Sequence, residues 1–220
     1  MKSKAKSILG KAFPRYALYW RAFNSFLRYD NSYLYSTGWM RSLREGKPVD
    51  KNGGDVPWMN YPVVRFLKGR LRKDFQLFEF GSGYSTSFYA RLVQSVTSVE
   101  HDEEWLRVAR KIAPENVTLI FKEKDINGEY CRVINSTGQK YDVVIVDGKD
   151  RVNCIKQSIE ALMSRGVIVL DDSQMEFYLE GINYAKEKGF RALDFEGLKP
   201  TGYEVDRTTI LYRCDNCFGI

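Results

Sequence analysis

A glycine-rich turn follows a strongly apolar segment near residue 80, and its residue types suit the binding of a nucleoside. The segment Leu77–Phe80 runs directly into Gly81-Ser82-Gly83. Glycines let the backbone approach a ligand closely, because they carry no Cβ atom. Glu100 ends the next strand-like run, 19 residues after Gly81, where an acid can accept hydrogen bonds from two ribose hydroxyls. We therefore expect a nucleoside-cofactor site, although a plain strand-to-helix turn would use the same two glycines.

Acidic residues follow five consecutive strand-like segments, and this pattern indicates one shared edge of a sheet. From residue 75 onward, apolar strand-like segments alternate with helix-like segments, which is typical of a mainly parallel sheet covered on both faces. Ligands of such sheets bind at the carboxyl ends of the strands. The acids at those ends are Glu79, Glu100, Asp102, Asp125, Asp147, Asp150, Asp171 and Asp172. So many acids on one edge favour a binding site over isolated helix caps.

The elements that must position these residues can be predicted from the apolar periodicity. Strands are expected at residues 76–80, 96–100, 117–121, 142–146, 166–171, 190–195 and 208–213. Helices are expected at 85–94, 102–112, 152–163 and 175–188, the first of them capped by Ser85 and Thr86. No helical pattern separates the last two strands, so the seventh strand should enter antiparallel. The predicted fold class is α/β, with a doubly wound, mainly parallel seven-stranded sheet, an antiparallel last strand and an N-terminal helical arm.

Residues 1–56 are interpreted as the basic, aromatic N-terminal arm and residues 57–220 as the sheet domain. Helical spacing within 1–45 predicts two or three short helices, and an amphipathic helix is expected at about 63–71. The arm holds the basic character, because residues 1–47 contain ten Lys or Arg and two acids while the whole chain has a net charge of +6. We do not expect a nucleic-acid partner. A peripheral membrane contact and an ordinary solvated helix face stay open.

The overall composition indicates a cytoplasmic globular protein. The 220 residues are 44% hydrophobic and 28% charged, and the apolar runs are no longer than strands, which argues against disorder and against a membrane bundle. Basic residues interrupt the N-terminal segment, so we expect no secretion signal. Four cysteines and one histidine are too few for a disulfide scaffold or a four-ligand zinc site.

Taken together, these motifs resemble the class I S-adenosylmethionine-dependent methyltransferases. The resemblance covers about residues 75–213 and rests on Glu79–Gly83, Val99–Asp102, Asp125, Tyr141–Gly148 and Gly166–Asp172. It implies the same fold and S-adenosylmethionine as the cofactor. It places Glu79 and the glycines against the methionine and ribose, Glu100 on the ribose diol, and Asp125 near the adenine. The full implied cofactor set is Glu79, Gly81, Ser82, Gly83, Ser85, Thr86, Glu100, His101, Asp125 and Asp147.

The chemistry of methyl transfer indicates which residues could be catalytic. Transfer from a sulfonium is a direct displacement, so a hydroxyl acceptor needs alignment and a base that removes its proton. We expect Asp147 to be this base, because it ends the fourth strand where the methyl group should lie. His101 is the second candidate, since imidazole exchanges protons near neutral pH, but it could instead pack over the nucleoside.

A divalent metal is a further expectation that the resemblance raises. Asp147, Asp171 and Asp172 look like the metal set of catechol-type O-methyltransferases, with Asp172 where that pattern has Asn. These carboxylates could hold Mg²⁺, or they could orient the cofactor and the neighbouring helix starts. Lys149 and Arg151 could meet a polar or anionic acceptor, or cap a helix.

The expected function is O-methylation of a small molecule or a glycan, with the oligomeric state left open. An NAD-dependent oxidoreductase would share the glycine turn and the acid, but this chain has Thr86 where that fingerprint has a third Gly or Ala. A non-catalytic nucleoside-binding protein, or one that docks onto RNA or a membrane through the arm, is the other alternative.

Overall fold

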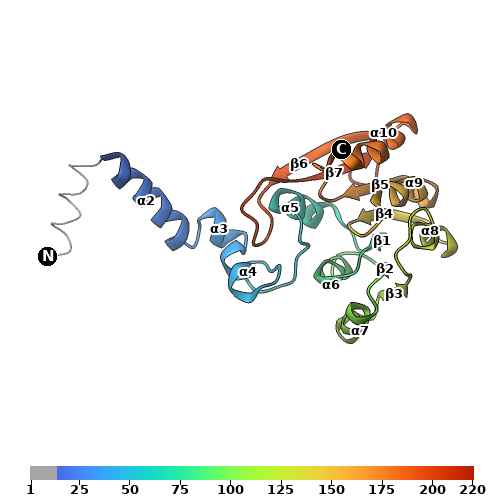
Figure 1. The fold of residues 1–220 in the computed structure, drawn as a ribbon, viewed down its shortest axis with the longest axis horizontal. Helices are drawn as coiled ribbons and strands as arrows, with labels where there is room; N and C mark the ends of the chain where they lie inside the picture. Colours follow the sequence, from blue (N-terminus) through green and yellow to red (C-terminus); the bar gives the residue numbers. More distant parts are fainter. Residues whose placement is uncertain (1–13) are drawn as a thin grey trace.

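Seven strands form one mixed sheet in the computed structural model, which describes residues 14–220 (Figure 1). The sheet has the order β3-β2-β1-β4-β5-β7-β6. The first five strands pair in parallel, whereas β7 runs antiparallel to both of its neighbours. The predicted fold class is therefore confirmed, including the antiparallel last strand. The strands are β1 (Gln76–Phe80), β2 (Ser95–Glu100), β3 (Val117–Phe121), β4 (Tyr141–Val146), β5 (Leu162–Leu170), β6 (Arg191–Gly197) and β7 (Asp206–Tyr212).

Most helices of the sheet domain connect consecutive strands, and three helices lie in the described part of the N-terminal arm, residues 14–56. Side-chain caps start several of them; for example, Asn60 accepts a hydrogen bond from the N–H of Val63, and Asp102 from that of Trp105. The helices are α2 (Pro14–Arg28), α3 (Tyr33–Ser36), α4 (Trp39–Glu45), α5 (Tyr61–Arg70), α6 (Tyr84–Ala90), α7 (Glu103–Ile112), α8 (Glu129–Ser136), α9 (Arg151–Ala161) and α10 (Leu179–Glu187), with a short 3-10 turn, η1 (Glu176–Tyr178), before α10.

Two apolar layers enclose the sheet, one on each face. Successive residues of a strand point to opposite faces, so Phe78 and Val144 join one layer while Leu77 and Val143 join the other. The first layer is completed by buried residues of α8, α9 and α10, and the second by those of α5 and α6. Because both faces are covered, the only part of the central strands that can meet a ligand is their ends.

The structure corrects the predicted elements at three places. Helix α8 was not predicted, although Tyr130 and Ile134 are buried at helical spacing on it. Strand β5 begins at Leu162 rather than at residue 166, because an irregular pairing with Tyr141 precedes its regular ladder with β4. Helix α6 ends at Ala90 rather than at residue 94, since the chain tightens into a turn around the carbonyl of Tyr89.

The N-terminal arm extends from the sheet domain and contacts it through α4 and the following loop. Figure 1 shows α2 projecting away from the sheet, with α3 and α4 between it and the domain. Trp39 of α4 donates a hydrogen bond from Nε1 to the carbonyl of Gly202 (2.7 Å), and Trp58 donates one to that of Pro200 (2.9 Å). The arm, through Trp39, and the start of the sheet domain, through Trp58, therefore both hold the loop between β6 and β7. Among the described helices, none combines the length and apolar character needed to cross a bilayer.

Candidate active site

The glycine turn between β1 and α6 packs directly against the turn that follows β4. Gly81 has a φ of +95°, and its N–H donates to the carbonyl of Val99 at 2.9 Å. A Cβ atom at Gly81 would lie 3.0 Å from the carbonyl oxygen of Asp147 and 3.1 Å from the Cα of Gly148. Both the left-handed backbone and the close approach require glycine at this position. At Gly83, by contrast, an added Cβ would make only an ordinary van der Waals contact with Ser85, at 3.6 Å or more.

Glu100 at the end of β2 is bound to this turn. Its Oε2 accepts hydrogen bonds from the N–H and from the hydroxyl of Ser82, both at 3.0 Å. Its Oε1 accepts the N–H groups of His101 and Asp102, both at 2.8 Å. Three backbone N–H donors therefore fix the carboxylate of Glu100. The fourth hydrogen bond, from the Ser82 hydroxyl, can be broken by rotation of the Ser82 side chain about its Cα–Cβ bond. The structure brings Glu100 to the turn, as the sequence predicts.

The side chain of Glu79 is buried beneath the glycine turn and is not exposed at the surface. The residue is fully buried, and its carboxylate accepts hydrogen bonds from the hydroxyls of Ser85, Thr86 (2.6 Å) and Ser98 (2.9 Å). Burial raises the pKa of Glu79 to about 7, while the three hydroxyl donors oppose that shift. Glu79 therefore ties β1, β2 and the first turn of α6 together. A direct contact with a cofactor remains a prediction.

Ser85 and Thr86 perform different tasks at the start of α6. The hydroxyl oxygen of Thr86 accepts the N–H of Gly83 at 3.0 Å, which is the predicted capping role. Ser85 makes no such cap, because its hydroxyl donates to Glu79 instead. Trp105 of α7 donates from Nε1 to the carbonyl of Ser82 at 2.9 Å and so supports the turn from the other side.

His101 and Asp125 meet the same helix, α8. The His101 ring lies edge-on to the Tyr130 ring with centroids 6.2 Å apart, and its Nδ1 is 2.9 Å from Oε1 of Glu100 without the geometry of a hydrogen bond. The Asp125 carboxylate accepts the N–H groups of Glu129 (2.7 Å) and Tyr130 (3.1 Å). Asp125 thus caps α8, and a contact between this residue and an adenine stays a prediction.

Three carboxylates follow β4 and β5, and two of them contact cationic side chains. The carboxylate oxygens of Asp147, Asp171 and Asp172 can all lie within 4.8 Å of one another. Arg151 reaches Asp147 at 3.0 Å and Asp172 at 3.3 Å, and Lys199 from the β6–β7 loop reaches Asp172 at 3.0 Å. The predicted cluster therefore forms, and sequence reasoning missed the lysine that completes it.

The pKa values of the three carboxylates are shifted in different directions. Burial raises the pKa of Asp147 to about 6, with the charge of Arg151 opposing the shift. Burial and the negative charge of Asp147 raise the pKa of Asp171 well above its ordinary value. Burial would also raise the pKa of Asp172, but the hydrogen bond from Lys199 and the charge of Arg151 bring it below its ordinary value. Protons added to the cluster therefore go to Asp171 and Asp147 before Asp172.

This donor set does not fit Mg²⁺ as the side chains stand. Three carboxylates would suit a hard cation, but Oδ1 of Asp147 and both oxygens of Asp172 already contact Arg151 or Lys199. A metal ion would have to displace those cations. The geometry favours the other interpretation, in which the carboxylates orient neighbouring groups, and metal binding stays a prediction.

Residues outside the predicted set also shape the site. Thr208 of β7 donates from its hydroxyl to Asp171 at 2.6 Å and accepts a hydrogen bond from Asn60 at 2.9 Å. Asp206 contacts Lys199 at 3.4 Å, and its buried Oδ2 has no hydrogen-bond partner within residues 14–220. Sequence gives no periodic signal for these contacts, because each joins strands or loops that are far apart along the chain.

Comparison with known proteins decides which fold this is. Neither a protein-family model nor a curated protein sequence matches the chain. An rRNA methylase from Streptococcus thermophilus superposes with a TM-score of 0.53 at 18% identity, over 69% of this chain and 96% of that one. A proposed O-methyltransferase from Klebsiella pneumoniae gives 0.54 at 18% identity, over 80% and 87%. The chain has the class I methyltransferase fold.

The same methyltransferase fold occurs in a structure that was solved with a ligand. A proposed methyltransferase from Streptococcus mutans, in complex with S-adenosylhomocysteine (SAH), superposes with a TM-score of 0.50 at 17% identity, over 67% of this chain and 94% of that one. At such identities the likeness establishes the fold, and the activity has to be argued from the site.

Proposed function

We propose that this chain is an S-adenosylmethionine-dependent methyltransferase that methylates a hydroxyl group of a small molecule or a glycan. The observation that carries the proposal is the buried carboxylate of Glu100, which ends β2 and faces the glycine turn at Ser82. The fold supports the same cofactor class, since structures that share it are named as methylases or methyltransferases and one holds SAH.

The residues of the turn suit a nucleoside with a cationic sulfur. Gly81 lets the backbone approach closely without a side chain, and an added Cβ at Gly83 would contact only Ser85. Glu100 can accept a ribose hydroxyl at Oε2 once the Ser82 hydroxyl turns away, because the three backbone N–H donors occupy its other acceptor positions and keep the carboxylate in place. The acidic edge of the sheet favours a sulfonium cation, and such a ligand has no phosphate that would call for a basic clamp.

Asp147 is our candidate for the base. When bound, S-adenosylmethionine supplies a methyl group on a sulfonium, and the acceptor oxygen bonds to that carbon as the carbon–sulfur bond breaks. Arg151 holds Oδ1 of Asp147, whereas Oδ2 makes no hydrogen bond within residues 14–220 and is available for the acceptor proton. With a pKa of about 6, Asp147 is largely ionised at neutral pH and can accept that proton. His101 remains the second candidate.

Two observations favour this proposal over an NAD-dependent oxidoreductase. The dinucleotide-binding fold has the strand order 3-2-1-4-5-6 without an inserted antiparallel strand, whereas β7 lies between β5 and β6 in this sheet. At the position of the third glycine, Thr86 bonds to both Gly83 and Glu79, so a side chain is required there.

Titration calorimetry tests the cofactor assignment directly. We expect saturable binding of S-adenosylmethionine and of SAH, with no binding of NAD. Binding of NAD alone would contradict the proposal. Transfer of a labelled methyl group to a panel of glycans and hydroxylated small molecules then tests the reaction, and cofactor binding without any transfer would favour a non-catalytic protein.

A further inference from the structure

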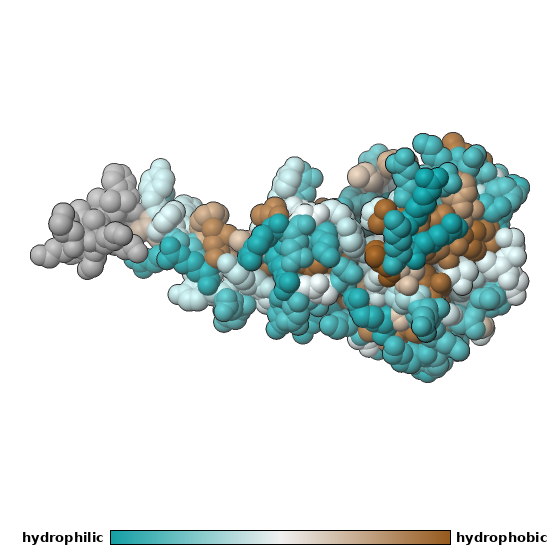
Figure 2. Space-filling view, turned by 90° about the horizontal axis from the view of Figure 1, so that it is seen from below, coloured by the Kyte–Doolittle hydropathy of each residue, from teal (hydrophilic) through white to brown (hydrophobic). Residues whose placement is uncertain are grey.

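Helix α2 exposes an aromatic face to solvent. Four large aromatic side chains of this helix are between 51% and 68% exposed, and their spacing places them on one side of it. They are Tyr19, Trp20, Phe23 and Phe26. Figure 1 shows that α2 projects away from the sheet domain, and Figure 2 shows hydrophobic side chains, coloured brown, at the surface of the projecting arm. Such a row of large exposed aromatic side chains indicates a surface that binds a partner or a membrane.

The opposite side of α2 is polar and basic. Arg21 and Arg28 lie there with Asn24 and Ser25, whose side chains bond back to helix carbonyls, and with the exposed Leu18, while Arg15 lies at the edge of the aromatic face. The helix contains no acidic residue. Basic residues on one face and aromatic residues on the other are the pattern of a helix that lies in the plane of a membrane interface.

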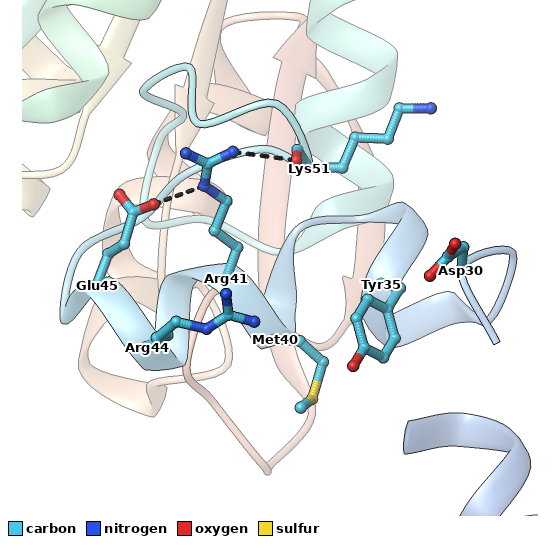
Figure 3. Close-up of a pocket in the computed structure, with 7 residues that line it drawn as sticks. All are labelled: Asp30, Tyr35, Met40, Arg41, Arg44, Glu45 and Lys51. Atoms are coloured by element: carbon cyan, nitrogen blue, oxygen red, sulfur yellow. Dashed lines mark hydrogen bonds and ion pairs between the residues drawn. The ribbon is translucent and has the colours of Figure 1, made fainter. Parts of the chain in front are cut away.

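The rest of the arm carries further basic residues, which outnumber its acids. A pocket of about 450 Å³ opens between α3, α4 and the following turn, and Figure 3 shows three basic residues, Arg41, Arg44 and Lys51, lining it together with two acids, Asp30 and Glu45. Arg41 is held by Glu45 at 2.5 Å, whereas Arg44 and Lys51 make no ion pair among the described residues. Since residues 1–47 contain ten basic residues and two acids, an anionic partner fits this arm.

We propose that α2 binds an anionic phospholipid surface and holds the sheet domain against it. The aromatic face would enter the headgroup region while the basic side chains meet lipid phosphates. The helix has 15 residues, which span only about 22 Å, and arginines interrupt it, so it lies on the membrane and does not cross it.

Two other partners fit the helix less well. A second copy of the chain would cover the aromatic face but would bring more basic residues to an already basic arm. Single-stranded RNA binds where bases stack on aromatic side chains beside the cations that contact its backbone. On α2 two of the three arginines, Arg21 and Arg28, lie on the face opposite the aromatic residues, and Arg15 lies at the edge of the aromatic face.

The anchor is linked to the candidate active site through α4. Trp39 of α4 bonds to the loop that carries Lys199, and Lys199 contacts Asp172. Membrane binding through α2 would therefore keep the candidate site close to the lipid surface. The inference does not depend on the proposed function, because vesicle binding can be measured without cofactor.

Co-sedimentation of the full chain with vesicles tests the inference. We expect binding to vesicles of phosphatidylcholine mixed with phosphatidylglycerol, weak binding to phosphatidylcholine alone, and a fall in binding with salt. The double variant Trp20→Ser/Phe23→Ser should lose at least about tenfold in vesicle affinity, because two large apolar side chains leave the interface. Arg21→Gln/Arg28→Gln should reduce the preference for the anionic lipid.

A matched control removes exposed apolar side chains elsewhere. Tyr203→Ser/Val205→Ser alters two highly exposed residues of the β6–β7 loop and should leave vesicle binding unchanged. Equal binding by the helix variant and the wild type would overturn the proposal. The proposal would also be overturned if the wild type did not bind vesicles and formed a dimer, while the helix variant was a monomer. Binding of single-stranded RNA without binding of vesicles would overturn it as well.

Discussion

Ser82 and Glu100 join the glycine turn to the second strand through two hydrogen bonds that end on the same carboxylate oxygen. The backbone N–H and the hydroxyl of Ser82 both lie 3.0 Å from Oε2 of Glu100. The first bond belongs to the fold, whereas the second can be exchanged for a ligand hydroxyl at little cost. The carboxylate of Glu100 is therefore already held in position to accept a ligand hydroxyl in place of that of Ser82.

The close packing of the two turns predicts an unequal effect of alanine at two glycines. Gly81 and Gly189 both have left-handed backbones, with φ of +95° and +84°, but only Gly81 would bring its Cβ against the backbone of Asp147 and Gly148. Gly189→Ala should cost about 1 kcal/mol of unfolding free energy, and Gly81→Ala about 2–4 kcal/mol. Urea unfolding measures both, and equal losses would show that the turns do not pack as described.

The sequence could predict the sheet because its strands are apolar on both faces and separated by helical segments. The positions of Gly81 and Glu100 followed from the same reasoning, since the ends of neighbouring parallel strands meet at one edge. Helix α8 escaped prediction because it is only eight residues long and its cap comes from the side chain of Asp125 outside it.

The ion pairs of the candidate site could not be predicted in the same way. Lys199 reaches Asp172 across 27 residues of sequence, and its position depends on Trp39 and Trp58, which hold the β6–β7 loop. Neither secondary-structure propensity nor hydrophobic periodicity predicts a contact between residues so far apart in the sequence. The expected metal set was read from three carboxylates alone, without the cations that share their oxygens.

The buried carboxyl of Glu79 predicts a pH-dependent stability. Its pKa rises from an ordinary 4.5 to about 7 in the folded state, so the folded protein retains a proton that the unfolded chain has lost. The stability that this group contributes is present below pH 4.5 and is lost as the pH rises through about 7, on the order of 3 kcal/mol.

Glu79→Gln should remove this part of the pH dependence, because the amide does not titrate. Unfolding free energies measured by urea at about pH 5 and about pH 8 bracket the transition. The exposed Glu104 lies outside the site, and Glu104→Gln should keep the wild-type slope. If Glu79→Gln also kept that slope, the raised pKa of Glu79 would be contradicted.

The proposed base makes a prediction about rate. With an acceptor identified by methyl-transfer screening, the wild-type kcat should rise with pH through about 6 as Asp147 loses its proton. Asp147→Asn should lower kcat by about 10²–10⁴-fold and remove this rise. A base acts on kcat, whereas a residue that only binds the methyl donor would change its KM. A normal pH profile in Asp147→Asn, together with a lost profile in His101→Gln, would assign the base to His101.

The most direct test of the account is calorimetric titration of S-adenosylmethionine into wild type, Glu100→Ala, Ser82→Ala and Glu104→Gln. A hydrogen bond to a carboxylate is worth about 1.5–3 kcal/mol, so Glu100→Ala should weaken binding by about 10- to 100-fold. Ser82→Ala should bind at least as tightly as wild type, because it removes the hydroxyl that competes for Glu100, and Glu104→Gln should be unchanged. Circular dichroism confirms that each variant is folded. Wild-type affinity in a folded Glu100→Ala variant, or a wild type that does not bind S-adenosylmethionine, would contradict the account.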